Sequence, residues 1–261
     1  MRHVAVEMLN QCDLPVTTQG MTHPNILAVA LLSRTLANLK GVIALTKQGL
    51  AVEARVLARC CYENMFTVGG LYAEGEEFAK KMIEDNDAGR KGRVRFTVET
   101  PRIFNSLSAE MQDAVKEKHD TFAAGPKTGF LMPKQVAGLS EFKETYLVYS
   151  QFSGDAAHPT LMALALHWGP AGSTTSYFDV EPKARNSELD ETLHLACIAL
   201  MGIMVVVNEM HGYTEAGTTL PVLNQELVAL QNEKWGEDPS TPPSCGALRR
   251  RWVSSTPVLR L

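Results

Sequence analysis

The longest apolar stretch in the chain runs from Leu195 to Val207 and contains no charged residue and no strong hydrogen-bonding side chain. A helix that is apolar on every side has to be covered on every side. The stretch is shorter than the roughly 20 residues that a bilayer span needs, and polar His194 and Asn208 flank it. We therefore predict that Ser187–Gly212 is a soluble core helix, the central element of an all-α, multi-helix bundle.

Two earlier segments also show helical spacing. Pro24 opens the first, in which Val29, Leu32, Leu36, Leu39 and Ile43 recur at intervals of three and four residues, as one buried stripe does. The second, about residues 50–72, is rich in small residues that favour close packing on a neighbouring helix. Both are predicted to pack around the central helix.

The middle of the chain is more polar. Residues 76–87 and 108–118 predict exposed helices, and 120–138 predicts a long loop. Between them, residues 89–100 break the helical pattern with two glycines and the only basic cluster of the globular part, formed by Arg90, Lys91, Arg93 and Arg95. Short charge runs of this kind are usually solvated. We expect no nucleic-acid partner unless these four residues provide the contact.

Later segments complete the predicted architecture. Ser140 is expected to cap a helix over 141–152 that Gly154 ends, and residues 161–180 predict one short β-hairpin. Pro221 is expected to start a last helix that ends near residue 235. Residues 1–236 are thus predicted to form a single helical domain. Residues 237–261 change to a Pro-rich and Arg-rich tail, expected to be flexible, that looks like the translated end of a mobile gene cassette.

Composition limits the classes of function. A chain of 261 residues with 45% hydrophobic content can bury a full core, and a net charge of −4 gives no general attraction to nucleic acid or to an anionic membrane. The odd number of cysteines, five, does not suggest a disulfide framework. We expect a cytoplasmic protein with no membrane partner and no cofactor, and a homodimer formed through outer helices.

Polar residues on two predicted helices are the candidate site. Arg55, Arg59 and Glu63 lie one turn apart along one edge of the second long helix. The segment that follows Ser140 carries further polar and aromatic groups, namely Tyr146, Tyr149, Ser150, Ser153 and His158. These side chains would form one network if the two helices meet.

These positions resemble an uncharacterised, all-helical bacterial family of unknown function. The matching pattern is Ala54-Arg55-x-x-x-Arg59-x-x-x-Glu63, followed by Tyr146, Ser150 and His158-Pro159, within about residues 24–212. The resemblance implies a helical fold and a microbial, cytoplasmic setting. It brings no established activity.

Three interpretations of the network stay open. In one, Arg59, Glu63, Tyr146 and His158 only satisfy one another in a buried structural network, as in a plain interaction or structural protein. In a second, His158 is a general acid or base tuned by Glu63, while Arg55 and Arg59, with Tyr146, Tyr149 and Ser150, hold a small anionic ligand such as phosphate or carboxylate.

The third interpretation is a metal site. Asp155-x-x-His158 and Glu191-x-x-His194 are carboxylate–histidine pairs at one-turn spacing, and Glu63 could add a third carboxylate. However, Gly154 and Pro159 argue against a continuous helix at the first pair, and no second bridging glutamate is evident. We therefore expect no metal.

Overall fold

The computed structural model describes residues 1–14, 20–125, 129–158, 160–165, 167–168, 178–180, 182 and 184–235. Within these residues the regular secondary structure is helical, and the only β-type pairing is one isolated antiparallel bridge between Trp168 and Phe178. The predicted all-α class is confirmed.

Contacts within the chain divide it into two compact units, Met1–Ala73 with Pro133–Leu261, and Glu74–Met132. The larger unit holds the apolar helices, and the smaller one holds the charged segment. A single domain over residues 1–236 stays a prediction, and the predicted tail, 237–261, lies outside the described residues.

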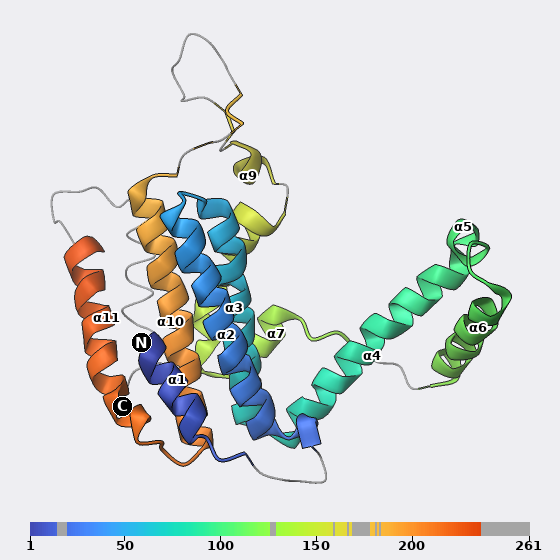
Figure 1. Cartoon of the computed structure of the whole chain (residues 1–261), viewed down its shortest axis with the longest axis horizontal. Helices are drawn as coiled ribbons and strands as arrows, with labels where there is room; N and C mark the ends of the chain where they lie inside the picture. Colours follow the sequence, from blue (N-terminus) through green and yellow to red (C-terminus); the bar gives the residue numbers. More distant parts are fainter. Residues whose placement is uncertain are drawn as a thin grey trace. The chain divides into compact units, whose positions relative to one another are not determined.

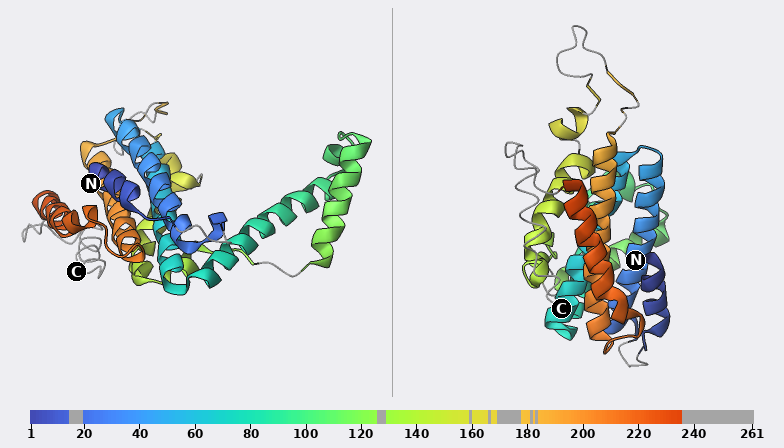
Figure 2. Two further views of the ribbon diagram at one scale, coloured as in Figure 1. Left: turned by 60° about the horizontal axis from the view of Figure 1, so that its bottom comes forward. Right: turned by 90° about the vertical axis from the view of Figure 1, so that its left-hand side faces the viewer.

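Long helices form the larger unit (Figures 1 and 2): α1 (Arg2–Gln11), α2 (Pro24–Lys47), α3 (Ala51–Glu74), α10 (Asn186–Met210) and α11 (Leu220–Trp235). Shorter elements connect α3 to α10, namely α7 (Pro133–Ala137), the 3-10 turn η2 (Glu141–Thr145), α8 (Tyr146–Phe152), the π-turn η3 (Ser153–Ala157) and α9 (Leu161–Ala165). A 3-10 turn, η4 (Ala216–Thr219), precedes α11. The sequence pattern did not predict α1.

The predicted central helix is confirmed by its burial. Every residue of α10 from Ala199 to Asn208 is buried. Gly202 shows why α3 can pack so closely on it, because a Cβ at this position would come within 2.7 Å of the Met65 sulfur. The Tyr62 hydroxyl also donates a 3.1 Å hydrogen bond to the Leu195 carbonyl oxygen, so a polar group inside this core is satisfied.

The starts of two helices follow different chemistry. As predicted, α2 begins at Pro24, and the His23 ring nitrogen accepts a hydrogen bond from the Asn25 backbone N–H at 3.2 Å. The predicted start of α10 at Ser187 is one residue late, because the helix begins at Asn186. Arg185 is the N-cap, because its backbone N–H donates to the Glu188 carboxylate at 3.0 Å.

Two helices, α2 and α10, are long and apolar enough to cross a membrane by length and composition alone. Most residues in the apolar part of α10 are buried inside the protein. A core helix that is mostly buried passes the same test of length and composition. Burial of α10 therefore agrees with its predicted place in the core. The cytoplasmic location stays a prediction.

In the smaller unit, the predicted break of the helical pattern at residues 89–100 is wrong. Helix α4 (Glu76–Glu99) continues through both glycines, and α5 (Pro101–Phe104) and α6 (Ala109–Ala124) follow it. Contacts with α6 support the second half of α4, including the Lys91 ammonium 5.9 Å from the Phe122 ring centre. Tertiary packing thus outweighs the helix-breaking tendency of glycine, about 1 kcal/mol per residue. The predicted loop at 120–138 is correspondingly shorter, because α6 and α7 occupy both its ends.

One local prediction after Ser140 is wrong, and a second is tested only in part. Gly154 does not end the helix, because the chain continues through it as a π-turn up to Ala157. The predicted hairpin over 161–180 falls in part outside the described residues, which omit 166 and 169–177. Within the described part, Leu161–Ala165 is helical and Trp168 pairs with Phe178 in an antiparallel bridge, so a shorter hairpin stays a prediction. The Thr160 hydroxyl caps this helix by accepting from the Ala163 backbone N–H at 3.1 Å, which favours a helix over a strand.

Candidate functional site

One edge of α3 carries the three polar residues singled out from the sequence. Arg55, Arg59 and Glu63 lie one turn apart, so their side chains leave the helix on the same side. Tyr149 of α8 contacts this edge, and so do Asp155 of the π-turn and Thr192 of α10. The two polar segments therefore meet in the structure, through Tyr149 and Asp155.

Arg59, Glu63 and Tyr149 form a closed triangle, called here the Arg59 cluster. The Arg59 Nη2 atom lies 2.7 Å from Glu63 Oε1 and donates to the Tyr149 hydroxyl oxygen at 3.1 Å. The Tyr149 hydroxyl in turn donates to the same Glu63 oxygen at 3.2 Å. Each of the three side chains thus has two polar partners within the cluster.

Aromatic packing holds the Arg59 cluster in place. The Tyr149 ring is buried, with its centre 5.8 Å from that of Phe66 and 5.5 Å from that of Tyr146. The Arg59 guanidinium carbon lies 5.2 Å from the Tyr149 ring centre, within cation–π range. Tyr149 therefore supports Arg59 through both its ring and its hydroxyl.

The electrostatics of the triangle follow from this geometry. Burial raises the pKa of Tyr149, and the hydrogen bond from Arg59 opposes that rise, so the phenol stays neutral and can donate to Glu63. Burial disfavours the charge on Arg59, but the hydrogen bond to Tyr149 and the charge of Glu63 outweigh it and raise the Arg59 pKa. The Arg59 Nε atom is buried without a hydrogen-bond partner among the described residues.

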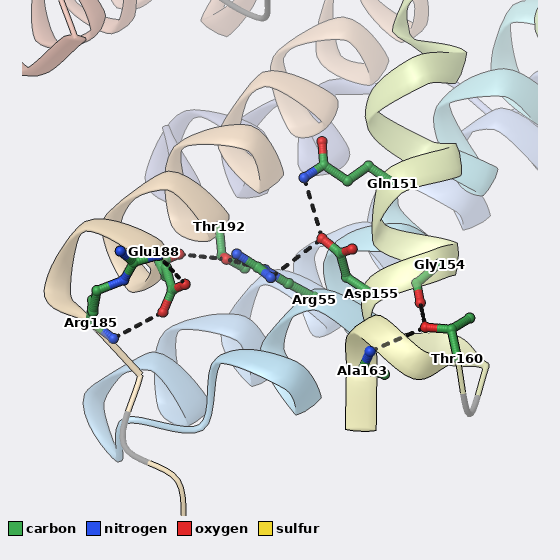
Figure 3. Close-up of polar contacts among 9 residues, drawn as sticks. All are labelled: Arg55, Gln151, Gly154, Asp155, Thr160, Ala163, Arg185, Glu188 and Thr192. Carbon is green, nitrogen blue, oxygen red and sulfur yellow. Dashed lines mark hydrogen bonds and ion pairs between the residues drawn. The ribbon is translucent and has the colours of Figure 1, made fainter. Parts of the chain in front are cut away.

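A second group, called here the Arg55 cluster, joins α3, α8, the π-turn and α10 (Figure 3). Arg55 Nη1 lies 3.4 Å from Asp155 Oδ2, and Arg55 Nε donates to the Thr192 hydroxyl oxygen at 3.4 Å. The Gln151 amide donates to the same Asp155 oxygen at 3.3 Å, and the Thr192 hydroxyl donates to the Glu188 carbonyl oxygen at 2.7 Å. All contacts to the guanidinium and to Asp155 in this cluster are long for charge-assisted hydrogen bonds, which are typically about 2.7–2.9 Å.

Glu188 adds an acidic group beside the Arg55 cluster. Its carboxylate accepts from the Arg185 guanidinium at 2.9 Å (Figure 3). Burial raises the pKa of Glu188, but the hydrogen bonds from Arg185 and the positive charge of Arg55 outweigh it, so the pKa lies below its ordinary value. The carboxylate is therefore ionised at neutral pH, and its negative charge attracts the positive charge of Arg55.

The remaining predicted site residues lie apart from these contacts. Tyr146 is half-buried and reaches the Arg59 cluster only through its ring, and Ser150 is exposed. His158 is exposed after the π-turn, and no contact between its ring and Glu63 appears in the described part of the chain. The catalytic roles of His158 and Glu63 stay predictions.

Sequence reasoning missed the partners of Arg55. The sequence pattern indicates Asp155 only as a possible metal ligand, and it does not indicate Gln151, Thr192 or Glu188 as partners of Arg55. Gln151 and Asp155 have the four-residue spacing of neighbours on a helix, which was the available signal. The expected helix end at Gly154 hid it, because a π-turn has no sequence pattern of the kind that glycine and proline give to ordinary turns.

Metal-binding groups do not converge in the described part of the chain, where no three His, Cys, Asp or Glu side chains are placed to hold one ion. The side chain of Asp155 is engaged with Arg55 and Gln151. Burial lowers the pKa of His194, while a hydrogen bond with Gln231 opposes that shift. Asp155 and His194, one residue from each carboxylate–histidine pair, thus already have protein partners.

A small cavity of about 160 Å³ lies at the other end of α10. It is lined by residues from the end of that helix, from η4 and from the start of α11, among them Asn208, Tyr213, Thr214 and Leu220. This volume is below the roughly 300–1,000 Å³ of typical ligand pockets. None of the predicted site residues lines it.

Comparisons with known proteins address the family and leave the activity open. Neither the curated proteins nor the solved structures contain a match to this chain. A family model described as a family of unknown function, DUF5677, matches residues 25–174. That range includes the edge of α3 and the segment from Tyr146 to the π-turn, although it stops before α10. Since the match spans more than half of the chain, this helical protein belongs to the DUF5677 family.

Proposed function

We propose that the Arg55 cluster binds a small anionic group, a phosphate or a carboxylate, at the end of the bundle where α3 and α10 begin. Arg55 is the principal ligand-binding residue. Arg59, one turn further along α3, adds a second positive charge to this edge of the helix. The other predicted residues, Tyr146, Ser150 and His158, do not contact Arg55 in the described structure and are not assigned to the binding cluster. We propose that this binding takes place in the cytoplasm.

The observation that carries the proposal is the loose pairing of Arg55. Its contact with Asp155 is a single 3.4 Å approach, whereas Arg59 and Glu63 meet at 2.7 Å. Arg55 Nη2 has no hydrogen-bond partner among the residues that the structure describes. A guanidinium has a planar fork of donors that suits two oxygens of one carboxylate or phosphate, and at Arg55 this capacity is not used up.

An anion would bind here by replacing Asp155 as the partner of Arg55. One ligand oxygen would accept from Nη1 and a second from Nη2, which gives the bidentate geometry that Asp155 lacks. The Gln151 amide, which now donates to Asp155, would be able to donate to the ligand instead. The Arg55 side chain keeps 11% of its surface exposed, so the ligand would be largely shielded from water and its ion pair strengthened.

A structural role is the second candidate, and the Arg59 cluster favours it. Its three polar groups satisfy one another, and the Tyr149 ring is packed into the aromatic core. A network of this kind stabilises a helical core whether or not a ligand binds. In this alternative the protein would act through interactions with other macromolecules.

Thermal melting in the presence of anions tests the proposal. Phosphate and a panel of small carboxylates and nucleotides should raise the melting temperature of the wild-type protein, because binding to the folded state stabilises it. Arg55→Gln should abolish this rise. Arg2→Gln, which removes an exposed arginine of α1, is the matched control and should keep it.

Asp155→Asn makes the test sharper. Removing the competing carboxylate should strengthen anion binding by several-fold, about 1 kcal/mol, because Arg55 then has a neutral partner to exchange. If neither the wild-type protein nor Asp155→Asn responds to any anion of the panel, the binding proposal is wrong and the structural role remains.

A further inference from the structure

Within the Glu74–Met132 unit, the α4–α6 hairpin buries few of its own side chains. The buried residues of α4 are Phe78, Ala79 and Ala88, and the described α6 has none. Two paired helices leave most of each helix surface in water, and helical stability in proteins comes mainly from packing of an apolar face. The side chain of Phe96, on the second half of α4, is 62% exposed.

The exposed Phe96 ring belongs to a line of residues along α4 that runs beside an uncovered glycine. Met82, Gly89 and Phe96 are spaced seven residues apart, close to two helical turns, so they lie nearly on one line along the helix. Gly92 lies beside this stripe, and a Cβ added there would have no atom within 4 Å. Packing within the Glu74–Met132 unit therefore does not account for glycine at position 92, although glycine costs a helix about 1 kcal/mol.

Charge is distributed unevenly along the same helix. Acidic residues predominate before Ala88, and basic residues predominate after it, where Glu99 is the only acid of the second half. Several charges are already paired within the helix, as in Lys80–Glu77, Arg90–Asp87 and Arg95–Glu99. Arg93 has no ion-pair partner within the described residues. One oxygen of Asp85 accepts from the Leu131 backbone N–H at 2.8 Å, and its other oxygen has no such role.

From these features we infer that α4 docks antiparallel against α4 of a second copy of the chain, about a twofold axis at Gly89. Residues equally far from Gly89 on either side then face each other. Met82 meets Phe96 of the second copy, and Asp85 meets Arg93 of the second copy. The acidic half of each α4 lies against the basic half of the other. The small residues Gly89 and Gly92 let the two helices approach closely.

The charge pattern selects this orientation. In a parallel pair in register, Asp85 would face Asp85 and Arg93 would face Arg93, which is repulsive. A twofold antiparallel pair is self-complementary, as the interface of a symmetric dimer has to be. The inference concerns the Glu74–Met132 unit and goes beyond anion binding at Arg55, so either can fail without the other.

Sedimentation equilibrium of the full chain at micromolar concentration tests the inference. The wild-type chain should be a dimer. Arg93→Asp should weaken self-association about tenfold or more, the equivalent of 1.4 kcal/mol or more, because like charges then face each other. Arg95→Asp makes the same charge change on another side of α4 and should leave the dimer intact.

Mixing two variants provides a complementary test. Arg93→Asp and Asp85→Arg should each associate weakly alone, but an equimolar mixture should form a heterodimer in which both charge pairs are restored. Circular dichroism shows whether each variant is folded, since Asp85→Arg also removes the contact with Leu131. Failure of two folded variants to associate in the mixture would overturn the pairing.

Cross-linking tests the position of the axis without relying on Asp85. A cysteine introduced by Gly89→Cys lies on the twofold axis and should form a disulfide with its copy under mild oxidation. Arg95→Cys should not. A monomeric wild-type chain, or equal cross-linking of both variants, would contradict the inference.

Discussion

Arg55 and Arg59 are the same residue type, one turn apart on one helix, yet their surroundings differ. Arg59 meets a carboxylate at 2.7 Å and rests against a buried tyrosine ring. Arg55 meets its carboxylate at 3.4 Å and spans two helices through a threonine hydroxyl. The difference shows that the neighbouring elements decide whether an arginine of α3 is held in the core or left able to exchange its partner.

The partners come from segments of different regularity. Tyr149 lies on α8, and regular helical spacing places it with Phe152 against Tyr62 and Phe66. Asp155 lies on the π-turn, whose wider winding shifts the side chains that follow. π-Turns are frequent at functional sites, which agrees with assigning ligand binding to the Arg55 cluster and support to the Arg59 cluster.

The largest expected effect is on the supporting cluster. Tyr149→Ala removes a buried ring and its hydroxyl and should lower the free energy of unfolding by about 3–5 kcal/mol. Tyr146→Ala, which truncates a half-buried ring beside it, should cost clearly less. Urea unfolding followed by circular dichroism measures both. Equal losses for the two variants would contradict the distinction between a core tyrosine and a peripheral one.

An intermediate effect compares the two acids directly. Glu63→Ala leaves Arg59 without its carboxylate and should lower the free energy of unfolding by about 1–2 kcal/mol, less than for a fully buried pair because both side chains are partly exposed. Asp155→Ala should cost about 0.5 kcal/mol or less, since its contact with Arg55 is long. Chemical unfolding of both variants measures the two losses in the free energy of unfolding. A larger loss for Asp155→Ala would reverse the proposed roles.

The smallest expected effect is the pH dependence due to Glu188. Its pKa in the folded protein lies below the ordinary value of 4.5, so the unfolded chain takes up the proton at a higher pH than the folded one. Glu188 therefore contributes stability above about pH 4.5, and this contribution is lost as the pH falls through the lower pKa of the folded state.

Thermal melts from neutral to acidic pH measure this contribution. Glu188→Gln should be less stable than the wild-type protein at neutral pH, and the difference should shrink in acid. Glu226→Gln, a change at an exposed position of α11, should show no such convergence. A difference for Glu188→Gln that does not depend on pH would show that its carboxylate charge does not stabilise the start of α10.

The sequence was most informative where one periodic pattern extends over many residues. The apolar stretch 195–207 predicted a buried helix, and α10 is buried from Ala199 to Asn208. Pro24 marked the start of α2, and the one-turn spacing of Arg55, Arg59 and Glu63 placed them along one edge of α3. Such patterns depend only on the geometry of a single helix, so they can be recognised without knowing its neighbours.

Only the tertiary structure decided the features that depend on partners from distant segments. The continuation of α4 through Gly89 and Gly92 depends on contacts with α6, and the chain continues through Gly154 as a π-turn although glycine locally favours a helix end. In the same way, Arg55 and Arg59 look alike in the sequence, and their different environments arise from Asp155 and Tyr149, each about 90–100 residues away along the chain. Spacing along one helix is local, whereas the partner that a side chain meets is set by how the helices pack.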